Sequence, residues 1–371
     1  MRKLLGVFLL FACQVVAQPD RQMDSVFIQA SVCIAQPGDV LYSCIGHSFI
    51  RMSCPHYNLD YCFSYEGESV RHNIATYLAG NLKMGMVMIP TQDFLRLYKE
   101  EGRGVIEYSL NLPLSQKKKL WRLLDMRVAQ GLNLPYDYME RGCALSCFQL
   151  IKESMTQHEE LNISQWPNHF SMTRRELVSR QLKDYPWTAF ILYCLVGIDG
   201  DLNVTNGDKI VTPSDLLFIL QQTTLNDNPL IEENGKELVP WKKKDCGHFF
   251  PSPLFISLML LFITGVCIWK RWRFHEFALL AIQTGIGLFL FYLIFVSSLP
   301  CTDWNWLFVA FNPLPLLSWK WRKKWEIIYS VVLAVWLSVI LVYPHKLVDN
   351  TYYVLTFTFI LMYINNYFNK I

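Results

Sequence analysis

The sequence has little net charge of either sign. Its 34 Lys and Arg residues nearly balance 31 Asp and Glu residues, which leaves a formal charge of +3. No basic stretch is interleaved with aromatic residues, so nothing favours a nucleic-acid partner. No internal repeat is evident either, which argues against a stacked-repeat architecture.

Apolar and aromatic side chains are abundant instead. Hydrophobic residues make up 52% of the 371 positions and aromatic residues 15%, both high for a soluble protein. The excess lies mostly after Pro251. This distribution predicts one sizeable soluble domain followed by a membrane-embedded part.

The N-terminus has the form of an export signal. Basic residues at positions 2 and 3 precede an apolar run, and a small-residue cleavage site ends at Ala17. Residues 1–17 are therefore predicted to be a signal peptide. Cleavage after Ala17, or an uncleaved anchor, is favoured over lipidation at Cys13, because the bulky Phe11 fits a lipoprotein signal poorly. Either outcome places the soluble domain outside the cytoplasm.

An exported domain can form disulfides. Four of the 11 cysteines fall in a short early stretch, namely Cys33, Cys44, Cys54 and Cys62. Bridges from Cys54 to Cys62 and from Cys33 to Cys44 are both candidates. The sequence leaves their connectivity open.

Residues 18–245 are predicted to form one mixed α/β domain. Polar and apolar residues alternate over 46–52 as in a half-buried strand, and 61–65 resembles its hairpin partner. The polar stretch 225–247 is interpreted as a juxtamembrane linker.

Two helices are predicted between these segments. One covers 91–101 with Thr91 as its N-cap, and the other continues from Ser115 to about residue 128 with Ser115 as its N-cap.

The segment that organises the domain follows Tyr136. After Gly142, Cys143 begins a run whose apolar spacing is that of a buried helix. A thiol in the first turn of a helix faces unpaired N–H groups and the positive end of the dipole, which favour the thiolate. We therefore predict that Cys143 is a nucleophile and that His47, on an early strand, is the base that takes its proton. The competing interpretation is that Cys143 only packs in the core.

A third group is expected to orient the imidazole. Ser64, Tyr65 and Glu66 on the neighbouring strand could reach it, and strand alternation places Ser64 and Glu66 on one face. Ser64 is favoured. Tyr138, together with Tyr136, is a candidate for the wall of the site or for a donor to the oxyanion.

A zinc site is a weaker alternative for the same residues. Cys143 and Cys147 on one helix, with His47, have a poor tetrahedral spacing without a second clear pair. No metal and no cofactor are therefore expected.

Five apolar segments follow residue 253: 254–269, 277–299, 304–318, 325–343 and 352–368. A span needs roughly 20 apolar residues. The third segment is short and contains Pro313 and Pro315, so a re-entrant path is the alternative to a crossing. If it crosses, the basic residues at 270–273 and 320–324 are all cytoplasmic. This predicts five crossings, an external soluble domain and a cytoplasmic C-terminus.

Asn305 and Asn312 lie within this apolar region. A polar side chain in a membrane is costly unless it is bonded, so these residues either join helices or line a lipid groove.

Several motifs resemble one family. Ile45 to Arg51, Asn111 to Ser115, and Asn133 to Cys143 are similar, in this order, to the Lnb N-terminal periplasmic domain. Trp304-Asn305-Trp306-Leu307 and Phe311 to Leu314 are similar to the membrane signature of the same family. Most members have Asn and Thr or Ser beside the cysteine, where this sequence has Gly142 and Ala144.

The resemblance implies an α+β, permuted papain-like (NlpC/P60-like) domain followed by an all-α transmembrane bundle of about five helices. It also implies a monomeric lipoprotein N-acyltransferase of the bacterial inner membrane, with its catalytic domain in the periplasm. Cys143 would take an acyl group from a membrane phospholipid as a thioester. It would then pass the acyl group to the α-amino group of the diacylglyceryl-cysteine at a lipoprotein N-terminus, with His47 as base.

Two other hypotheses remain. The same residues would suit a cysteine hydrolase of the NlpC/P60 or phospholipase type. Alternatively, the chain is a non-catalytic membrane partner protein with a degenerate domain.

Overall fold

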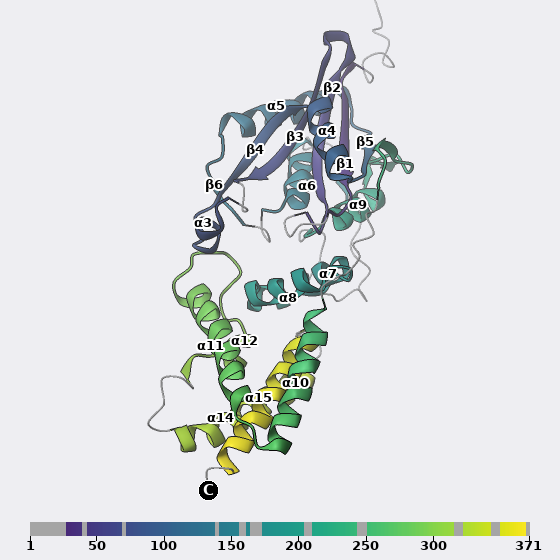
Figure 1. Ribbon diagram of the computed structural model, residues 1–371. Helices are drawn as coiled ribbons and strands as arrows, with labels where there is room; N and C mark the ends of the chain where they lie inside the picture. The colour runs from purple at the N-terminus through teal and green to yellow at the C-terminus, as the bar shows by residue number, and fades with distance from the viewer. Residues whose placement is uncertain are drawn as a thin grey trace, which may run out of the picture.

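The structure is a computed structural model. It describes residues 27–38, 43–68, 72–137, 141–155, 161–163, 173–203, 210–242, 251–314, 322–342 and 349–368. The predicted signal peptide and both candidate cleavage positions lie outside these ranges. A mixed α/β part, drawn at the top of Figure 1, is followed by a helical part at the bottom.

A seven-stranded sheet in the order β10-β5-β1-β2-β3-β4-β6 is the framework of the α/β part. All its neighbouring strands pair antiparallel. The strands are β1 (Gln29–Ala35), β2 (His47–Cys54), β3 (Leu59–Gly67), β4 (Lys83–Pro90), β5 (Val105–Ser109), β6 (Leu134–Pro135) and β10 (Lys236–Val239). The predicted hairpin of 46–52 and 61–65 is confirmed as β2 and β3, which are joined by the short helix η1 (Pro55–Tyr57).

Helices cover both faces of this sheet. On one face α5 (Leu114–Ala129), α6 (Cys143–Ser154) and α9 (Pro213–Gln222) enclose the larger core. Ile50 and Phe63 of the strands meet Leu120 and Phe148 of the helices in this core. On the other face α4 (Thr91–Glu101) packs Phe94 against the sheet. Neighbouring residues of one strand therefore point into different cores, as alternation requires.

Both predicted helices exist, but both predicted N-caps are wrong. α4 begins at Thr91 with Pro90 as its N-cap, and the Thr91 hydroxyl donates to Asp60 Oδ1 at 2.6 Å instead of capping. α5 begins at Leu114 with Pro113 as its N-cap. In each case Pro holds the extended conformation that an N-cap needs, so the hydroxyl falls one or two residues too late.

The interpretation of 225–247 as a linker is wrong for residues 225–239. β8 (Thr224–Leu225) and β9 (Asn228–Pro229) form a small sheet with β7 (Leu161–Asn162). β10 then extends the main sheet by pairing Lys236 with Glu107 of β5. An edge strand can be polar because only part of its surface is buried.

Cys33, Cys54 and Cys62 are free thiols. In the β2–β3 register Cys54 lies opposite Leu59 and Cys62 lies opposite Arg51, so the two cysteines are not cross-strand neighbours. Neither candidate bridge is formed in the structure.

Three helices are long and apolar enough to cross a membrane among the described residues: α10 (Pro253–Lys270), α11 (Phe274–Phe295) and the Trp325–Val342 part of α14 (Arg322–Val342). The fifth predicted segment lies in α15 (Asn350–Phe368), which carries Thr, Tyr and Asn side chains and is not among those three. The prediction of five crossings therefore remains a prediction.

The third predicted segment, 304–318, is not a regular helix over its described residues. Its described helical residues are α12 (Leu307–Ala310) and, separately, Leu314, and residues 315–318 lie outside the described ranges. Its start lies beside the α/β part, where the N–H of Gly197 donates to Cys301 O at 2.7 Å. Beyond it, α14 begins at the far end of the bundle in Figure 1.

Asn305 and Asn312 hold this irregular segment in place. The Asn305 amide donates to three carbonyls at the end of α8 (Pro186–Leu195), of which Cys194 O is the nearest at 3.0 Å. Asn312 donates to Tyr329 Oη of α14 at 2.6 Å. The Asn305 contacts satisfy backbone carbonyls that a membrane cannot. They favour the interpretation that the two residues join helices.

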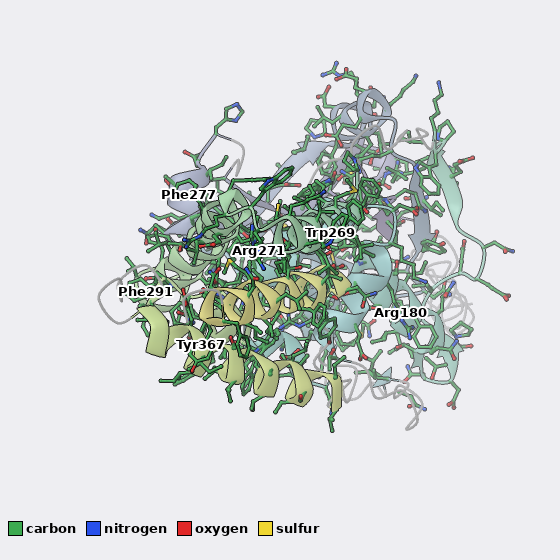
Figure 2. The ribbon with its side chains drawn as sticks, turned by 60° about the horizontal axis from the view of Figure 1, so that its bottom comes forward. Arg180, Trp269, Arg271, Phe277, Phe291 and Tyr367 are labelled. Carbon is green, nitrogen blue, oxygen red and sulfur yellow. The ribbon has the colours of Figure 1, made fainter. Side chains whose placement is uncertain are left out.

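The far end of the bundle is rich in exposed aromatic and basic residues. Figure 2, which brings this end forward, shows Trp269 and Arg271 at the turn between α10 and α11. Trp269 is 76% exposed and Phe277 81% exposed. Such a mixture is typical of a membrane–water interface.

Candidate active site

Cys143 is the first residue of α6, as the sequence predicts. The N-cap is Gly142, and no side chain caps the helix. The N–H groups of the first turn are therefore not used by a capping side chain. Gly is an acceptable N-cap, so the departure from the family motif at this position preserves the helix start.

His47 is the first residue of β2, where β2 and β3 separate. The two strands are paired from Cys54–Leu59 to Ile50–Phe63, and His47 lies beyond the last pair. Its imidazole is 18% exposed. The opening between the strands lets side chains of β3 and the start of α6 approach the same ring.

Ser64 and Glu66 of β3 both contact His47 Nε2. Ser64 Oγ lies 2.7 Å from Nε2 and itself donates to Glu66 Oε1 at 2.6 Å. Because the Ser64 hydroxyl donates its proton to Glu66, its oxygen accepts the proton of Nε2–H. Glu66 Oε1 is also 3.4 Å from Nε2. The predicted same-face pair thus acts as one relay, with Ser64 between the imidazole and the carboxylate.

This relay fixes the orientation of the ring. Nε2 carries the proton that Ser64 accepts, so Nδ1 is the nitrogen left for the Cys143 thiol, with which His47 forms a side-chain hydrogen bond. An imidazole held in this way can take the thiol proton at Nδ1.

The electrostatics of the pair favour charge separation. Burial opposes ionisation of Cys143, but the charge and hydrogen bond of His47 outweigh it and lower the thiol pKa from 9.0 to about 7. Burial also disfavours the imidazolium, but the charges of Cys143 and Glu66 raise the pKa of His47 to about 10. Thiolate and imidazolium therefore coexist near neutral pH.

Glu66 remains ionised beside this pair. Burial alone would raise its pKa, but the charge of His47 and the hydrogen bonds from His47 and Ser64 hold the pKa below its ordinary value. The carboxylate can therefore stabilise the imidazolium throughout a reaction.

Cys147, one turn along α6, has the opposite character. It is 4% exposed, and burial together with the neighbouring Cys143 charge raises its pKa. The same residue type on the same helix is thus an unreactive thiol. Among the described residues, no group of three or more His, Cys, Asp and Glu side chains could hold a metal ion.

Tyr136 borders the site, whereas Tyr138 lies outside the described residues. The Tyr136 ring lies against Gly67 at the end of β3, where a Cβ would come within 3.1 Å of it. Burial, and then the nearby charges including Cys143 and Glu66, raise the pKa of its phenol. Tyr136 therefore forms part of the wall next to the thiol. The sequence groups it with Tyr138 but gives no reason to prefer it.

A short helix connects this wall to the membrane bundle. Tyr77 of α3 (Ile74–Leu78) makes an edge contact with Tyr136 at 5.8 Å between ring centroids. Tyr77 also packs against the cluster of Leu195, Leu293 and Leu299. The N–H of Ser298 donates to Ala79 O at 3.1 Å. Figure 1 shows α3 between β6 and the loop that follows α11.

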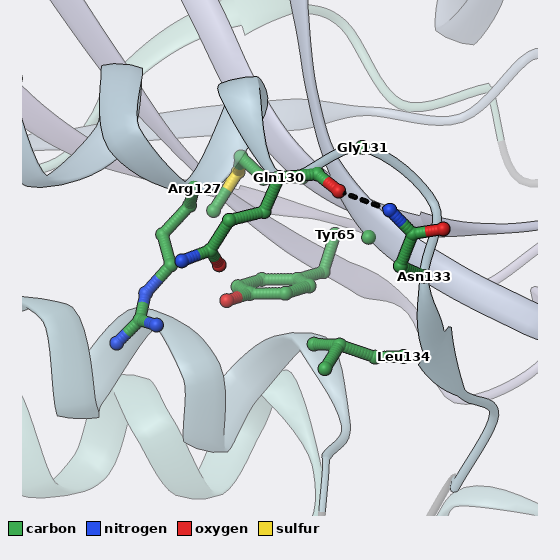
Figure 3. A pocket seen from close by; sticks show the side chains of 8 residues that line it. Tyr65, Arg127, Gln130, Gly131, Asn133 and Leu134 are labelled. Atoms are coloured by element: carbon green, nitrogen blue, oxygen red, sulfur yellow. Dashed lines mark hydrogen bonds between the residues drawn. The ribbon is translucent and has the colours of Figure 1, made fainter.

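A pocket of about 420 Å³ lies on the opposite side of β3. Tyr65, Arg127, Gln130 and Leu134 are among its lining residues, which Figure 3 shows around the Tyr65 ring. Its lining includes none of Cys143, His47, Ser64 and Glu66, so this pocket is distinct from the site around Cys143.

Other residues of the family-like motifs are structural. Arg51 pairs with Asp60 at 2.7 Å and with Glu107 at 2.9 Å, which ties β2 to β3 and β5. Asn111 donates to Pro229 O at 2.9 Å.

Comparison with known proteins identifies the domain. The family model of the Lnb N-terminal periplasmic domain matches residues 16–180. No curated protein and no solved structure matches the chain. The matched residues include Cys143, His47 and the relay of β3, and apolar helices follow them. Residues 16–180 therefore belong to the Lnb N-terminal periplasmic domain family, in a membrane protein whose N-terminal domain is periplasmic.

Proposed function

We propose that the protein is a lipoprotein N-acyltransferase that uses Cys143 as a thiol nucleophile. The observation that carries this proposal is the ionisable Cys143 thiol beside an imidazole held by Ser64 and Glu66. The bridge from Tyr136 through α3 to the helical bundle supports a membrane lipid as the acyl donor. A permuted papain-like arrangement, with the base on an early strand and the nucleophile on a later helix, agrees with this chemistry.

In the first half-reaction the Cys143 thiolate attacks an ester carbonyl of a glycerophospholipid. Backbone N–H groups at the start of α6 stabilise the oxyanion. His47 gives its proton to the departing glycerol oxygen, so a lysophospholipid leaves and an acyl-thioester remains on Cys143.

In the second half-reaction the thioester lowers the pKa of the His47 base. Acylation removes the sulfur charge that raises the pKa of His47, so the neutral imidazole can now accept a proton. The α-amino group of a diacylglyceryl-cysteine attacks the thioester while His47 takes a proton from the amine. The amide forms, the C–S bond breaks, and the thiolate is restored.

The test compares two cysteines of one helix. Mass spectrometry of lipoproteins from cells that produce Cys143→Ala should show N-terminal cysteines without the amide-linked chain. Cells that produce Cys147→Ala should show normal N-acylation, because that thiol is buried and un-ionised. Full N-acylation with Cys143→Ala would refute the proposal. Release of free fatty acid without transfer to an amine would point to the hydrolase hypothesis.

A further inference from the structure

Ser48 is a buried hydroxyl residue whose Oγ makes no hydrogen bond of ordinary geometry. It follows His47 in β2 and is 0% exposed. Buried hydroxyls in proteins almost always have a partner, so an orphaned one calls for an explanation. Its backbone pairs with Ile34 of β1, and the pairing with β3 does not extend to this residue.

The surroundings of Ser48 are set by α6. Strand alternation points its side chain to the face opposite His47, which is the face that α6 covers. There the hydroxyl lies close enough to interact with Cys143 and Cys147, and the Ser48 backbone interacts with Cys143 as well. Cys143 is thus held between two consecutive residues of β2, with the imidazole on one side and the hydroxyl on the other.

An apolar residue would fill this position equally well if Cys143 Sγ carried no charge. The next residues of the strand, Phe49 and Ile50, are both 0% exposed. A hydroxyl among them is useful only when a nearby atom becomes an acceptor. The one atom there that gains and loses a full negative charge during the proposed reaction is Cys143 Sγ.

We propose that Ser48 is a further catalytic residue, whose hydroxyl donates to Cys143 Sγ while the sulfur is negatively charged and is released when the sulfur is acylated. The release step rests on the proposed function, whereas the contact with the thiolate does not. Such a donor stabilises the Cys143 thiolate relative to the thioester. It therefore makes the sulfur a better leaving group in the second half-reaction.

The experiment measures the ionisation of Cys143 directly. The full-length protein is alkylated with iodoacetamide over a pH series, and modification of Cys143 and Cys147 is followed by peptide mass spectrometry. Ser48→Ala should shift the midpoint of Cys143 alkylation upward by about one pH unit, which is about tenfold less thiolate below the midpoint. Ser53→Ala is the matched control on the same strand, because Ser53 bonds to Gln29 at 3.3 Å instead.

Cys147 reports folding within the same samples, because a folded domain keeps it unmodified. If Cys147 becomes modified in Ser48→Ala, the isosteric pair Ser48→Thr and Ser48→Val is used instead. The midpoint pH of Cys143 alkylation is then expected to be higher in the Val variant than in the Thr variant. Superimposable profiles within either comparison would overturn the inference. No acyl donor or lipoprotein is needed, so a failure of the proposed acyl transfer is recognised separately, by N-acylation that persists with Cys143→Ala.

Discussion

At the scale of single residues, Ser64 and Glu66 divide the task of orienting His47. Ser64 supplies the short contact to Nε2, and Glu66 supplies the charge behind it. Glu66 Oε1 also stands 3.4 Å from Nε2, so the carboxylate can take over if the hydroxyl is removed. The two residues are therefore expected to have unequal importance.

Ser64→Ala is expected to lower the rate of acyl transfer about tenfold, the value of one hydrogen bond. Glu66→Gln should cost about a hundredfold, because a bond to a charged group is stronger and the imidazolium loses its counter-charge. Nuclear magnetic resonance titration should show a lower His47 pKa in Glu66→Gln than in Ser64→Ala. An equal pKa in the two variants would contradict this division.

The thiol and the imidazole also define a pH window for the first half-reaction. Below about pH 7 the Cys143 thiol is protonated and does not attack, because its folded pKa lies near 7 and not at 9.0. Above about pH 10 His47 has lost the proton that the glycerol oxygen needs. Formation of the acyl-enzyme, followed by intact-protein mass spectrometry, should therefore rise through pH 7 and fall through pH 10. A rising limb centred near pH 9 would show that the thiol is not activated.

At the scale of elements, α3 carries the contact between Tyr136, beside the Cys143 thiol, and the helical bundle. Gly80, just after α3, has φ of +77°, and a Cβ there would lie 2.2 Å from the Ser298 carbonyl carbon. A side chain at this position would push α3 away from the loop after α11. Tyr77 and Tyr136 would then lose their fixed position relative to the helical bundle.

Gly80→Ala is expected to reduce N-acylation severalfold and to lower the free energy of unfolding by about 1–3 kcal/mol. The pH dependence of Cys143 alkylation should stay unchanged, because His47 and the relay are untouched. Gly131→Ala is the matched control, since Gly131 also has positive φ but its Cβ would meet nothing closer than 3.6 Å. A similar loss of N-acylation in both variants would show that the contact of α3 with the loop after α11 is not needed for acyl transfer.

The elements that the sequence predicts well are those with a strong apolar pattern. Polar and apolar residues alternate in the β2–β3 hairpin, as in a strand, and apolar residues recur in α6 with the spacing of a helix. β10 is not predictable in this way, because a short, largely exposed edge strand has no such pattern. The predicted N-caps are wrong because Pro and a hydroxyl residue stand close together, and both suit a helix start.

At the scale of the whole molecule, the site is predictable in outline. His47 and Cys143 follow from a His on an early strand and a Cys at a helix start. Which of Ser64 and Glu66 contacts the imidazole directly is not predictable, because both lie on one face of β3. Only the folded structure shows that Ser64 makes the short contact and that Glu66 lies behind it. Ser48 carries no signal either, since a Ser on a strand beside His is an ordinary residue until α6 is packed against it.

The membrane topology is testable on the intact chain. With the basic turn at 270–273 and the basic cluster at 320–324 both inside, the C-terminus after α15 is expected in the cytoplasm. A reporter enzyme that is active only in the periplasm should be inactive when fused after residue 371 and active when fused after residue 242. Reporter activity at both positions would mean that the segment 304–318 is re-entrant and does not cross the membrane.

The reactivity of Cys143 arises from contacts among segments far apart in the sequence. In an extended chain its thiol would have the ordinary pKa of 9.0 and would be almost wholly protonated at neutral pH. The readily ionised thiol therefore does not exist in the unfolded polypeptide. It forms only when β2, β3 and α6 have assembled, so the completeness of folding can be read from the reactivity of this one thiol toward electrophiles.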